Sequence, residues 1–431
     1  MRTRILLVGL VVICATAVPA WSQSASKLDD HVAIEGPSEP GEATTETDSD
    51  KRKPTAEIYG FIQTDAGYDF GRNDPDWFDT VRPTKLPAFE NEFGEDGIAY
   101  FSVRQTRFGI KSWLPTSKGD VKTIFEWEMF GVGADAGQTT IRLRHSYAQY
   151  GRFGAGQYWS PFMDIDVFPN SMEYWGPSGM AFFRNVQVRY MPVMGEKNHV
   201  TIALERPGAS GDKGRYNEII EPQDLKARYP FPDLSAEYRH SGNWGYVEIA
   251  GILRHIEVDD VDATPPDLSS ESTGWGFNLS TNVKLGPNGS TLKASVLHGE
   301  GIENYMNDAT ADIIAVADPG NPNLLSVELI PVTGVVLFYD AYWNQHWTST
   351  FGFSLLSLDY DGTDALPATF ADGKYALANL QYHPVDKVMY GVEFQYGRRE
   401  NFSDDWTYDD YRIQFSFRYK YSFLLGGKNA Q

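Results

Sequence analysis

From Ala56 onward, short runs that alternate apolar and polar residues are separated by turn-forming residues. The clearest run is the last one, YRIQFSFRYKYSF, in which every second residue from Tyr411 to Phe423 is aromatic or apolar and the residues between them are polar or basic. Side chains alternate across a strand, so this run predicts a β-strand with one apolar and one polar face. A soluble sandwich would bury the apolar face, whereas an outer-membrane barrel would turn it toward lipid.

The number of these runs favours the barrel. About sixteen of them follow one another, and an even count of this size is typical of porins. We centre the predicted strands on Tyr59, Phe108, Phe125, Leu143, Tyr158, Val188, Ile202, Tyr238, Ile249, Phe277, Leu292, Leu337, Phe353, Leu377, Phe394 and Phe415.

The connections between the strands fall into two length classes. Residues 115–120, 286–290 and 383–387 form tight turns, whereas the long connections are 72–98, 207–232, 256–271, 300–332 and 360–373. Short turns at one rim and long loops at the other are typical of a bacterial outer-membrane barrel, and a sandwich has no reason to separate them. We therefore predict an all-β fold, a transmembrane antiparallel β-barrel of about 16 strands. Aromatic residues near strand ends, Trp113, Trp244, Trp343 and Trp347, are consistent with interfacial girdles, although each one taken singly fits ordinary core or rim packing equally well.

One stretch, from Gly154 to Pro192, begins and ends like strand but is broken in between. Pro161, Pro169 and Pro177 forbid a continuous strand ladder. Long loops without regular structure are usually functional or disordered, and the many aromatic residues here argue against disorder. This loop is therefore expected to pack against another part of the protein.

The first residues form an export signal. Two arginines precede an apolar run from Ile5 to Ile13 and then small residues up to Ala20, which is the pattern of a secretory signal peptide and is too short to span a bilayer. The only cysteine, Cys14, lies in this segment, so the exported chain has no disulfide. The predicted organisation is a signal peptide at 1–22, a flexible acidic linker at 23–54, the barrel domain at 55–423 and a C-terminal tail at 424–431.

Composition argues against two other classes of protein, helical membrane proteins and nucleic-acid-binding proteins. After the signal, no apolar run approaches the length of a transmembrane helix, which excludes a helical membrane protein. The formal net charge of −21 argues against a nucleic-acid partner, because phosphate binding needs a basic surface. Aromatic residues make up 14% of the chain, and they favour strands and bilayer interfaces.

Side chains alternate between the two faces of a strand, so the position of the apolar residues predicts which residues face the lumen. In RQTRFGIKSWL, VKTIFEWEMF, TIRLRHSYAQY and NVQVRY, turning the apolar residues outward turns the charged residues inward. A charge facing lipid would cost about 2–4 kcal/mol near the bilayer centre. The first and last strands of a closed barrel are neighbours. The sequence therefore predicts a basic lumenal wall formed by Arg107, Lys111, Lys122, Arg142, Arg144, Arg189, Arg412 and Arg418, with Lys420 beside them.

Such a wall has two interpretations. Rings of Arg and Lys favour anions in a pore, and guanidinium groups match carboxylate or phosphate. Alternatively, the bases neutralise lumenal Glu126 and Glu128 or acids of the inserted loop. Both interpretations can hold together.

The lumen also gives the proline-broken loop a place to pack. We predict that it folds into the barrel as a constriction loop, with its acids facing the basic wall and two aromatic residues narrowing the passage. The residues concerned are Asp164, Asp166, Glu173, Tyr174 and Trp175.

Catalytic and metal sites find little support. Asp164-Ile165-Asp166 and the DYDGTD segment at 359–364 lack the spaced ligands and the terminal Glu of an EF-hand. Glu126 and Glu128 share a face, but nothing places a sugar between them as a glycosidase would require. We expect no catalytic residue, no metal site and no cofactor, and hence no enzyme.

The segment TIFEWEMFGVGADAGQTTIRLRHSYAQYG, followed by the Gly154–Pro192 stretch, resembles the DcaP-like outer-membrane porins. The match is dense from about Ser102 to Pro192, and the last strand is also similar. The resemblance implies a trimeric, sixteen-stranded channel with an anion-selective constriction that passes small dicarboxylate-type solutes and has Arg142 and Arg144 on its basic wall. The chain departs from the family pattern in its N-terminal segment, which lacks coiled-coil heptads, and in the eight residues that follow Phe423.

The hypothesis from sequence is passive diffusion of small hydrophilic, anionic solutes through the bacterial cell outer membrane. Its partners would be those solutes, outer-membrane lipids and further copies of the chain in a homotrimer. One alternative is a secreted β-rich carbohydrate-binding protein or hydrolase, suggested by the Trp and Tyr residues. Another is a surface barrel that serves adhesion or assembly without transport.

Overall fold

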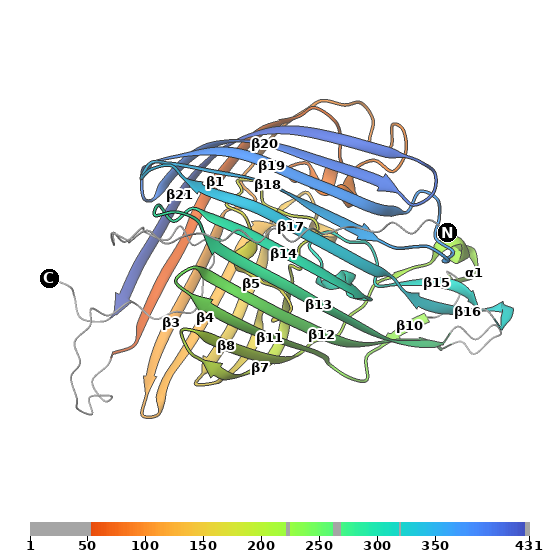
Figure 1. Cartoon of the computed structure of the whole chain (residues 1–431), viewed down its shortest axis with the longest axis horizontal. Coiled ribbons are helices and arrows are strands. Elements are labelled where there is room, and N and C mark those ends of the chain that lie inside the picture. Colours follow the sequence, from red (N-terminus) through yellow and green to blue (C-terminus); the bar gives the residue numbers. More distant parts are fainter. Residues whose placement is uncertain (1–52, 221–224, 262–268, 319, 427–431) are drawn as a thin grey trace.

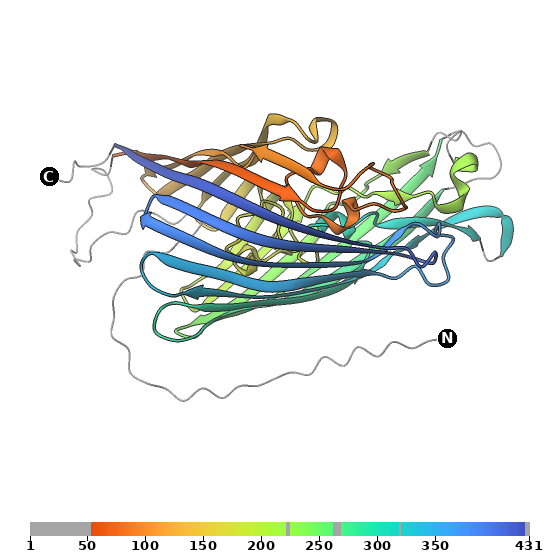
Figure 2. The same cartoon turned by 90° about the horizontal axis from the view of Figure 1, so that it is seen from above.

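A computed structural model describes residues 53–220, 225–261, 269–318 and 320–426. These residues form a β-barrel whose strands lie side by side around a central space (Figures 1 and 2). The predicted signal peptide (1–22), nearly all of the predicted linker (23–54) and most of the predicted tail (424–431) lie outside the described residues. The first strand begins at Thr55, and the last strand continues beyond Phe423 to Gly426.

The strands of the main sheet follow one another in chain order. They are β1 (Thr55–Asp69), β2 (Ile98–Ser102), β3 (Arg107–Thr116), β4 (Gly119–Phe130), β5 (Thr139–Tyr150), β6 (Phe153–Trp159), β7 (Arg184–Met194), β8 (Asn198–Glu205), β10 (Leu225–Arg228), β11 (Asp233–Gly242), β12 (Gly245–Asp260), β13 (Ser270–Lys284), β14 (Thr291–Glu300), β17 (Pro331–Tyr342), β18 (Trp347–Leu358), β19 (Phe370–Val385), β20 (Val388–Asn401) and β21 (Thr407–Gly426).

The main sheet closes on itself, because β1 pairs with β21 in antiparallel register along its whole length. Its 18 described strands make 16 barrel strands. Two barrel strands are each broken in two: β2 and β3 both pair with β1, and β10 and β11 both pair with β12. Each of the sixteen predicted strand centres lies in one of these barrel strands, so the predicted fold is confirmed.

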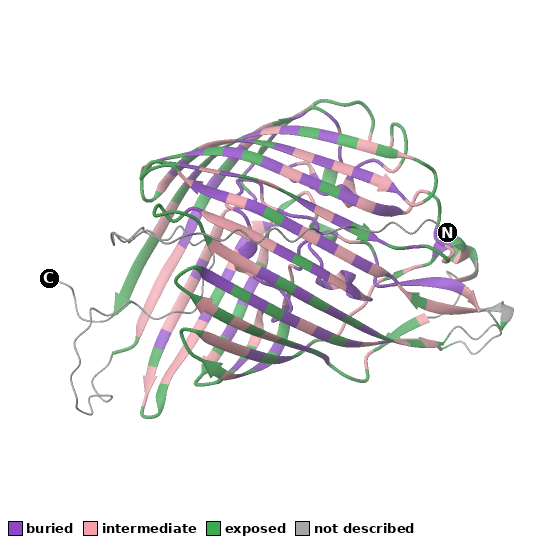
Figure 3. Cartoon of the chain, in the orientation of Figure 1, coloured by how far each residue is buried: buried purple, intermediate pink, exposed green. Residues whose placement is uncertain are grey.

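Buried and exposed residues alternate along the barrel strands (Figure 3). The chemistry of the two faces is the reverse of that in a soluble protein. Large apolar residues point outward, as with Val188, which is 60% exposed, and Phe415, which is 55% exposed. Charged residues at neighbouring positions are buried inside, as with Arg412 and Glu128, both 0% exposed. This exposed apolar belt is the surface that lipid covers in an outer-membrane barrel, and it leaves no outer polar face for a soluble sandwich.

Two local predictions about the barrel wall were wrong. Trp113, expected in an outer girdle, is 6% exposed and faces inward because it lies opposite Lys122 and shares the parity of Arg107. The predicted loop at 256–271 is shorter, since β12 and β13 extend their pairing to Val258 and Ser270. Trp244, Trp343 and Trp347 are exposed near short turns, as a girdle requires.

The long loops supply the remaining elements. The loops carry the short helix α1 (Asn217–Ile220) and a three-stranded sheet of β9 (Gly211–Asp212), β15 (Ile313–Asp318) and β16 (Asn321–Leu329) at one rim of the barrel (Figure 1). Among the described residues, no helix is long and apolar enough to cross a membrane.

Candidate functional site

The loop between β6 and β7, residues 160–183, folds into the barrel as predicted. Its residues Phe162 and Met172 are completely buried. The backbone N–H of Met172 donates to the Glu393 carboxylate at 2.8 Å, and the ammonium of Lys293 donates to the carbonyl of Phe168 at 2.6 Å. Because these partners lie on β20 and β14, the loop crosses the lumen rather than covering the rim.

The tip of this loop is fixed by hydrogen bonds from opposite sides. The carbonyl of Met172 accepts from the side-chain amides of Gln63, Gln105 and Gln414, at 2.9 to 3.2 Å. Glu393 accepts from the backbone N–H groups of Met172 and Glu173. A backbone peptide that is held on both its donor and its acceptor side has little freedom to move. The constriction is therefore a rigid part of the barrel.

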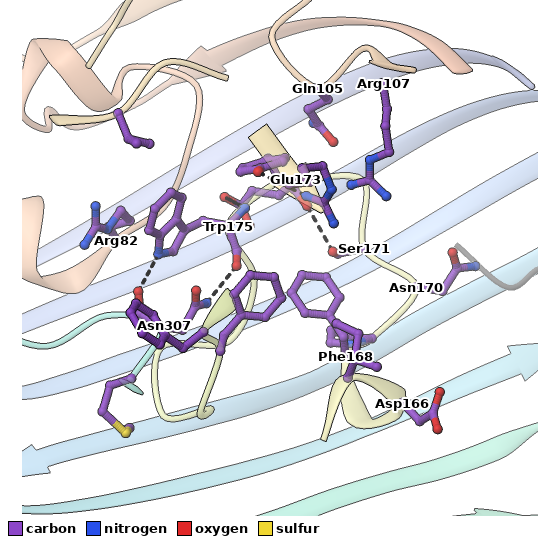
Figure 4. Close-up of a pocket in the computed structure, with 18 of the residues that line it drawn as sticks. Arg82, Gln105, Arg107, Asp166, Phe168, Asn170, Ser171, Glu173, Trp175 and Asn307 are labelled. Atoms are coloured by element: carbon purple, nitrogen blue, oxygen red, sulfur yellow. Dashed lines mark hydrogen bonds between the residues drawn. The ribbon is translucent and has the colours of Figure 1, made fainter. Parts of the chain in front are cut away.

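Two further loops enter the lumen, and the sequence analysis did not anticipate them. They are residues 70–97, between β1 and β2, and residues 301–312, between β14 and β15. Arg82 on the first loop forms an ion pair with Asp308 on the second, with Nε 3.0 Å from Oδ1. The Arg82 guanidinium also lies 4.1 Å from the ring centres of both Trp77 and Trp175. These contacts join all three loops, and Figure 4 shows Arg82 beside Trp175.

Together, the loops and the barrel wall enclose a cavity of about 490 Å³. Its lining includes aromatic residues from the loops and side chains from several strands (Figure 4). The basic residues on its surface are Arg82, Arg107, Arg142, Arg144, Lys293 and Arg418. The acidic ones are Asp166, Glu173 and Glu303.

The centre of the basic wall is a buried ion-pair network. Arg144 donates from Nε to Glu126 at 2.6 Å and from Nη1 to Glu128 at 2.7 Å. The hydroxyl of Tyr59 donates to Glu126 at 2.7 Å, and that of Tyr174 donates to Glu128. All four carboxylate oxygens therefore accept a hydrogen bond, and neither acid is left available for acid–base chemistry.

Three other arginines surround the same two acids at longer range. Arg107 approaches both glutamates at 3.7 to 3.8 Å, while Arg142 lies 3.8 Å and Arg184 lies 3.6 Å from Glu128. Four guanidinium groups thus face two carboxylates, an excess of two positive charges. Arg107 Nε, Arg142 Nη1 and Arg184 Nη1 are buried atoms without a hydrogen-bond partner among the described residues. Neutralisation of the two glutamates balances two of the four guanidinium charges, and Arg144, which makes the shortest contacts, is one of them. Two positive charges remain among the other three arginines.

The remaining predicted basic residues are divided between the cavity and the wall. Arg418 lines the cavity and donates to Gln63 at 2.5 Å. Lys111 and Lys122 do not line this cavity; Lys111 lies over the ring of Tyr59.

Arg189 and Arg412 hold the wall together instead of lining the cavity. The guanidinium of Arg189 donates to Gln187 and to the carbonyl of Trp159. That of Arg412 pairs with Asp69 at 2.7 Å and is completely buried. Their side chains are buried inside the barrel, in keeping with the predicted inward parity, but neither residue lines this cavity, because nearer acceptors hold both in the wall.

The predicted positions of the loop acids also need correction. Asp164 and Asp166 bind Arg239 on β11, and Asp164 also accepts from the hydroxyls of Tyr246 and Ser280 at 2.7 and 2.6 Å. They therefore face the wall of β11 to β13 and not the basic wall. The cause is the helical turn Ile165–Val167, which packs against β13 and β14 and directs both acids toward Arg239.

Glu173 does not contact the basic wall either. Its carboxylate accepts from the backbone N–H groups of Val81, Trp175 and Gly176 and from the Tyr375 hydroxyl. Burial raises the pKa of this loop carboxyl to about 8, while the bonds from Gly176 and Trp175 act in the opposite direction. Glu173 thus shapes the loop.

Tyr174 and Trp175, the two predicted aromatic residues, lie on the cavity surface. The Tyr174 hydroxyl donates to Glu128 on the basic wall, and the Trp175 indole N–H donates to the carbonyl of Asn307 at 2.8 Å (Figure 4). They therefore connect the constriction loop to the barrel wall and to the loop at 301–312.

Three basic residues near the constriction, Arg82, Arg184 and Lys293, are not among those predicted from sequence. Strand parity placed Arg184 on the outer face, but it is the first residue of β7, directly after the loop. Lys293 has inward parity on β14 and could have been found by that rule. No local signal predicts Arg82, whose partner Asp308 lies 226 residues away.

One group of metal-ligand side chains lies outside the lumen. The ligand atoms of His255, Glu257 and Glu271 lie within 4.8 Å of one another. Arg228 already binds Glu257, and exposed acids near a histidine are common without an ion. We assign no metal function to this group.

A closed 16-stranded barrel with an apolar outer belt, a polar lumen and loops that narrow it defines a porin-type channel of the bacterial outer membrane. Residues 38–421 match the family model of the DcaP outer membrane protein, and the chain belongs to this family.

Solved structures share this fold. The outer membrane channel DcaP of Acinetobacter baumannii is similar at a TM-score of 0.71 and 21% identity, over 85% of this chain and 97% of that one. An anion-selective porin from Comamonas acidovorans is similar at a TM-score of 0.56 and 8% identity, over 86% of this chain and 100% of that one. OmpT, an outer membrane protein of Vibrio cholerae, is similar at a TM-score of 0.51 and 12% identity, over 87% of this chain and 99% of that one. At these identities the likeness shows the fold. A comparison with curated proteins gave no match.

Proposed function

We propose that this outer-membrane channel passes small hydrophilic anions, dicarboxylates among them, by passive diffusion. The observation that carries the proposal is the excess of guanidinium groups over carboxylates at the narrowed part of the lumen. Arg107 and Arg142 both line the cavity and both keep a buried nitrogen without a hydrogen-bond partner. Guanidinium groups match carboxylates in shape and charge, so these two residues are the proposed solute contacts.

The charge distribution across the cavity supports selection by sign. Arg82 and Lys293 are each paired with an acid, Asp308 and Asp340, so they add no net positive charge. The excess therefore lies on one side, around Arg107 and Arg142. A basic lining raises the local concentration of anions and lowers that of cations. The acidic net charge of the whole chain does not change this local field, because salt screens distant surface charges.

We also propose that the channel is a homotrimer, as the sequence resemblance implies. Chemical cross-linking of the protein in native outer membranes tests this. A trimer gives a limiting product of three chains, and a product that stops at one or two chains contradicts the proposal.

Permeation into liposomes tests the proposed function. Succinate and 1,4-diaminobutane have four-carbon skeletons and carry opposite charges, so their comparison separates charge from size. Succinate enters faster if the arginine excess sets selectivity. Equal or faster entry of the diamine contradicts the anion proposal, and entry of neither solute indicates a barrel without transport.

A further inference from the structure

Glu303 differs from the other acids on the cavity surface. It begins the short helical turn Glu303–Tyr305 in the loop between β14 and β15, and only 3% of its surface is exposed. Its side chain lines the cavity. Neither of its carboxylate oxygens has a hydrogen-bond partner among the described residues. Leaving a buried carboxylate unpaired is costly, so its partner should be sought within the cavity.

The neighbouring acids all have partners. Asp166 binds Arg239, and Glu173 accepts four hydrogen bonds from the protein. Asp308, in the same loop as Glu303, binds Arg82. Glu303 is thus the one acid on the described cavity surface that no side chain of the described residues binds, and only the backbone N–H groups of Ile302 and Glu303 approach its carboxyl.

The basic residue that influences Glu303 is already engaged elsewhere. Arg254 binds Asp233 at 3.1 Å and Asp312 at 2.6 Å, and it also donates to the carbonyls of Gly208 and Gly301. Burial raises the pKa of the Glu303 carboxyl, and the negative charge of Asp312 acts in the same direction. The positive charge of Arg254 and the backbone N–H groups of Glu303 and Ile302 lower this pKa, but they do not offset the rise, because Arg254 is shared with two other acids.

We propose that Glu303 binds a positively charged, hydrogen-bond-donating group, such as a primary ammonium, on a solute whose carboxylate contacts Arg107 or Arg142. This inference rests on the proposed anion channel and extends its solutes to amino acids, amino dicarboxylates above all. An ammonium group offers three donors and no acceptor, which suits two free carboxylate oxygens. A cavity that carries both a basic wall and a free carboxylate favours solutes with both charges over pure dianions.

Interruption of single-channel current by succinate and by aspartate tests the proposal, because aspartate is succinate with one added ammonium. Glu303→Gln keeps the size of the side chain and removes its charge. Asp166→Asn is the matched control, since it also removes one negative charge from the cavity surface but from a carboxylate that Arg239 already occupies.

Glu303→Gln weakens aspartate binding relative to succinate by about tenfold, the size of one charge-assisted hydrogen bond of ~1.4 kcal/mol, and Asp166→Asn leaves the ratio unchanged. Equal effects of Glu303→Gln on both solutes overturn the inference, as does an equal change of the ratio in the control. Glu303→Asp, which retains the charge, keeps more of the aspartate preference than Glu303→Gln. If succinate fails to enter the wild-type channel at all, the proposed function has failed, which is a different result.

Discussion

The ion pair between Arg82 and Asp308, 3.0 Å long, joins two loops that are 226 residues apart in the chain. Asp308 is fully buried, and the Arg82 guanidinium packs against the rings of both Trp77 and Trp175, which are themselves in edge contact. One side chain therefore fixes three loops that enter the barrel from the same rim. The width of the passage depends on this contact as well as on the barrel wall.

Removing that contact should widen the channel. Arg82→Ala leaves Asp308 as an unpaired buried charge and lowers the free energy of unfolding by about 3–5 kcal/mol. With the loops released, single-channel conductance rises. Arg228→Ala, which breaks an exposed ion pair that solvent screens, changes stability little and leaves conductance unchanged. Similar conductance in both variants contradicts the role of Arg82.

Replacing Arg144 should mainly lower the stability of the barrel, whereas replacing Arg142 should mainly lower its preference for anions. Arg144→Ala leaves Glu126 and Glu128 without their shortest ion pairs and costs about 3–5 kcal/mol of unfolding free energy. The side chain of Arg142 is 26% exposed and lies 3.8 Å from Glu128. Arg142→Ala therefore lowers the unfolding free energy by less than about 1 kcal/mol. Denaturant titration measures the difference in unfolding free energy between the two variants. Reversal potentials measure selectivity, and we expect Arg142→Ala to lower the preference for anions although it barely changes stability.

The loop tip should loosen when Glu393 is replaced. Glu393→Ala leaves the backbone N–H groups of Met172 and Glu173 unpaired, and each buried donor costs about 1–3 kcal/mol. The open-channel current then becomes noisier as the tip moves. Glu400→Ala on the same strand removes a carboxylate that binds Lys374 and Arg398, and it leaves the noise unchanged. Quiet current in Glu393→Ala would show that other bonds fix the tip.

A charge on the outer face should be costly only in a membrane. Phe277 on β13 points outward, whereas Asn282 on the same strand lines the cavity. Phe277→Lys lowers the unfolding free energy in lipid by about 2–4 kcal/mol if it lies near the bilayer centre, and Asn282→Lys has a smaller effect. Equal costs contradict the assignment of faces.

The barrel could be predicted from sequence because its pattern is local. A repeat of two residues identifies a strand and its outer face together, so all sixteen strand centres and the inward parity of Arg144 and Arg189 followed from it. The proline-broken loop could also be recognised, because strand and loop chemistry conflict there.

The loop contacts could not be predicted in the same way. Loops have no period, and the direction in which they fold depends on partners far away in the chain, as with Arg82 and Asp308 or Asp164 and Arg239. Parity also says only that a residue faces inward. It does not tell whether a nearer acceptor holds the side chain in the wall, as Asp69 holds Arg412.

The central claim is that the excess of arginine over carboxylate charge in the constriction makes the channel prefer anions. The most direct test is the reversal potential in a planar bilayer under a potassium chloride gradient, for the wild type and for Arg107→Gln combined with Arg142→Gln. We predict an anion preference that the double variant reduces and that Arg189→Gln, outside the cavity, leaves in place. A cation preference in the wild type, or a double variant that behaves like the wild type, would contradict the account.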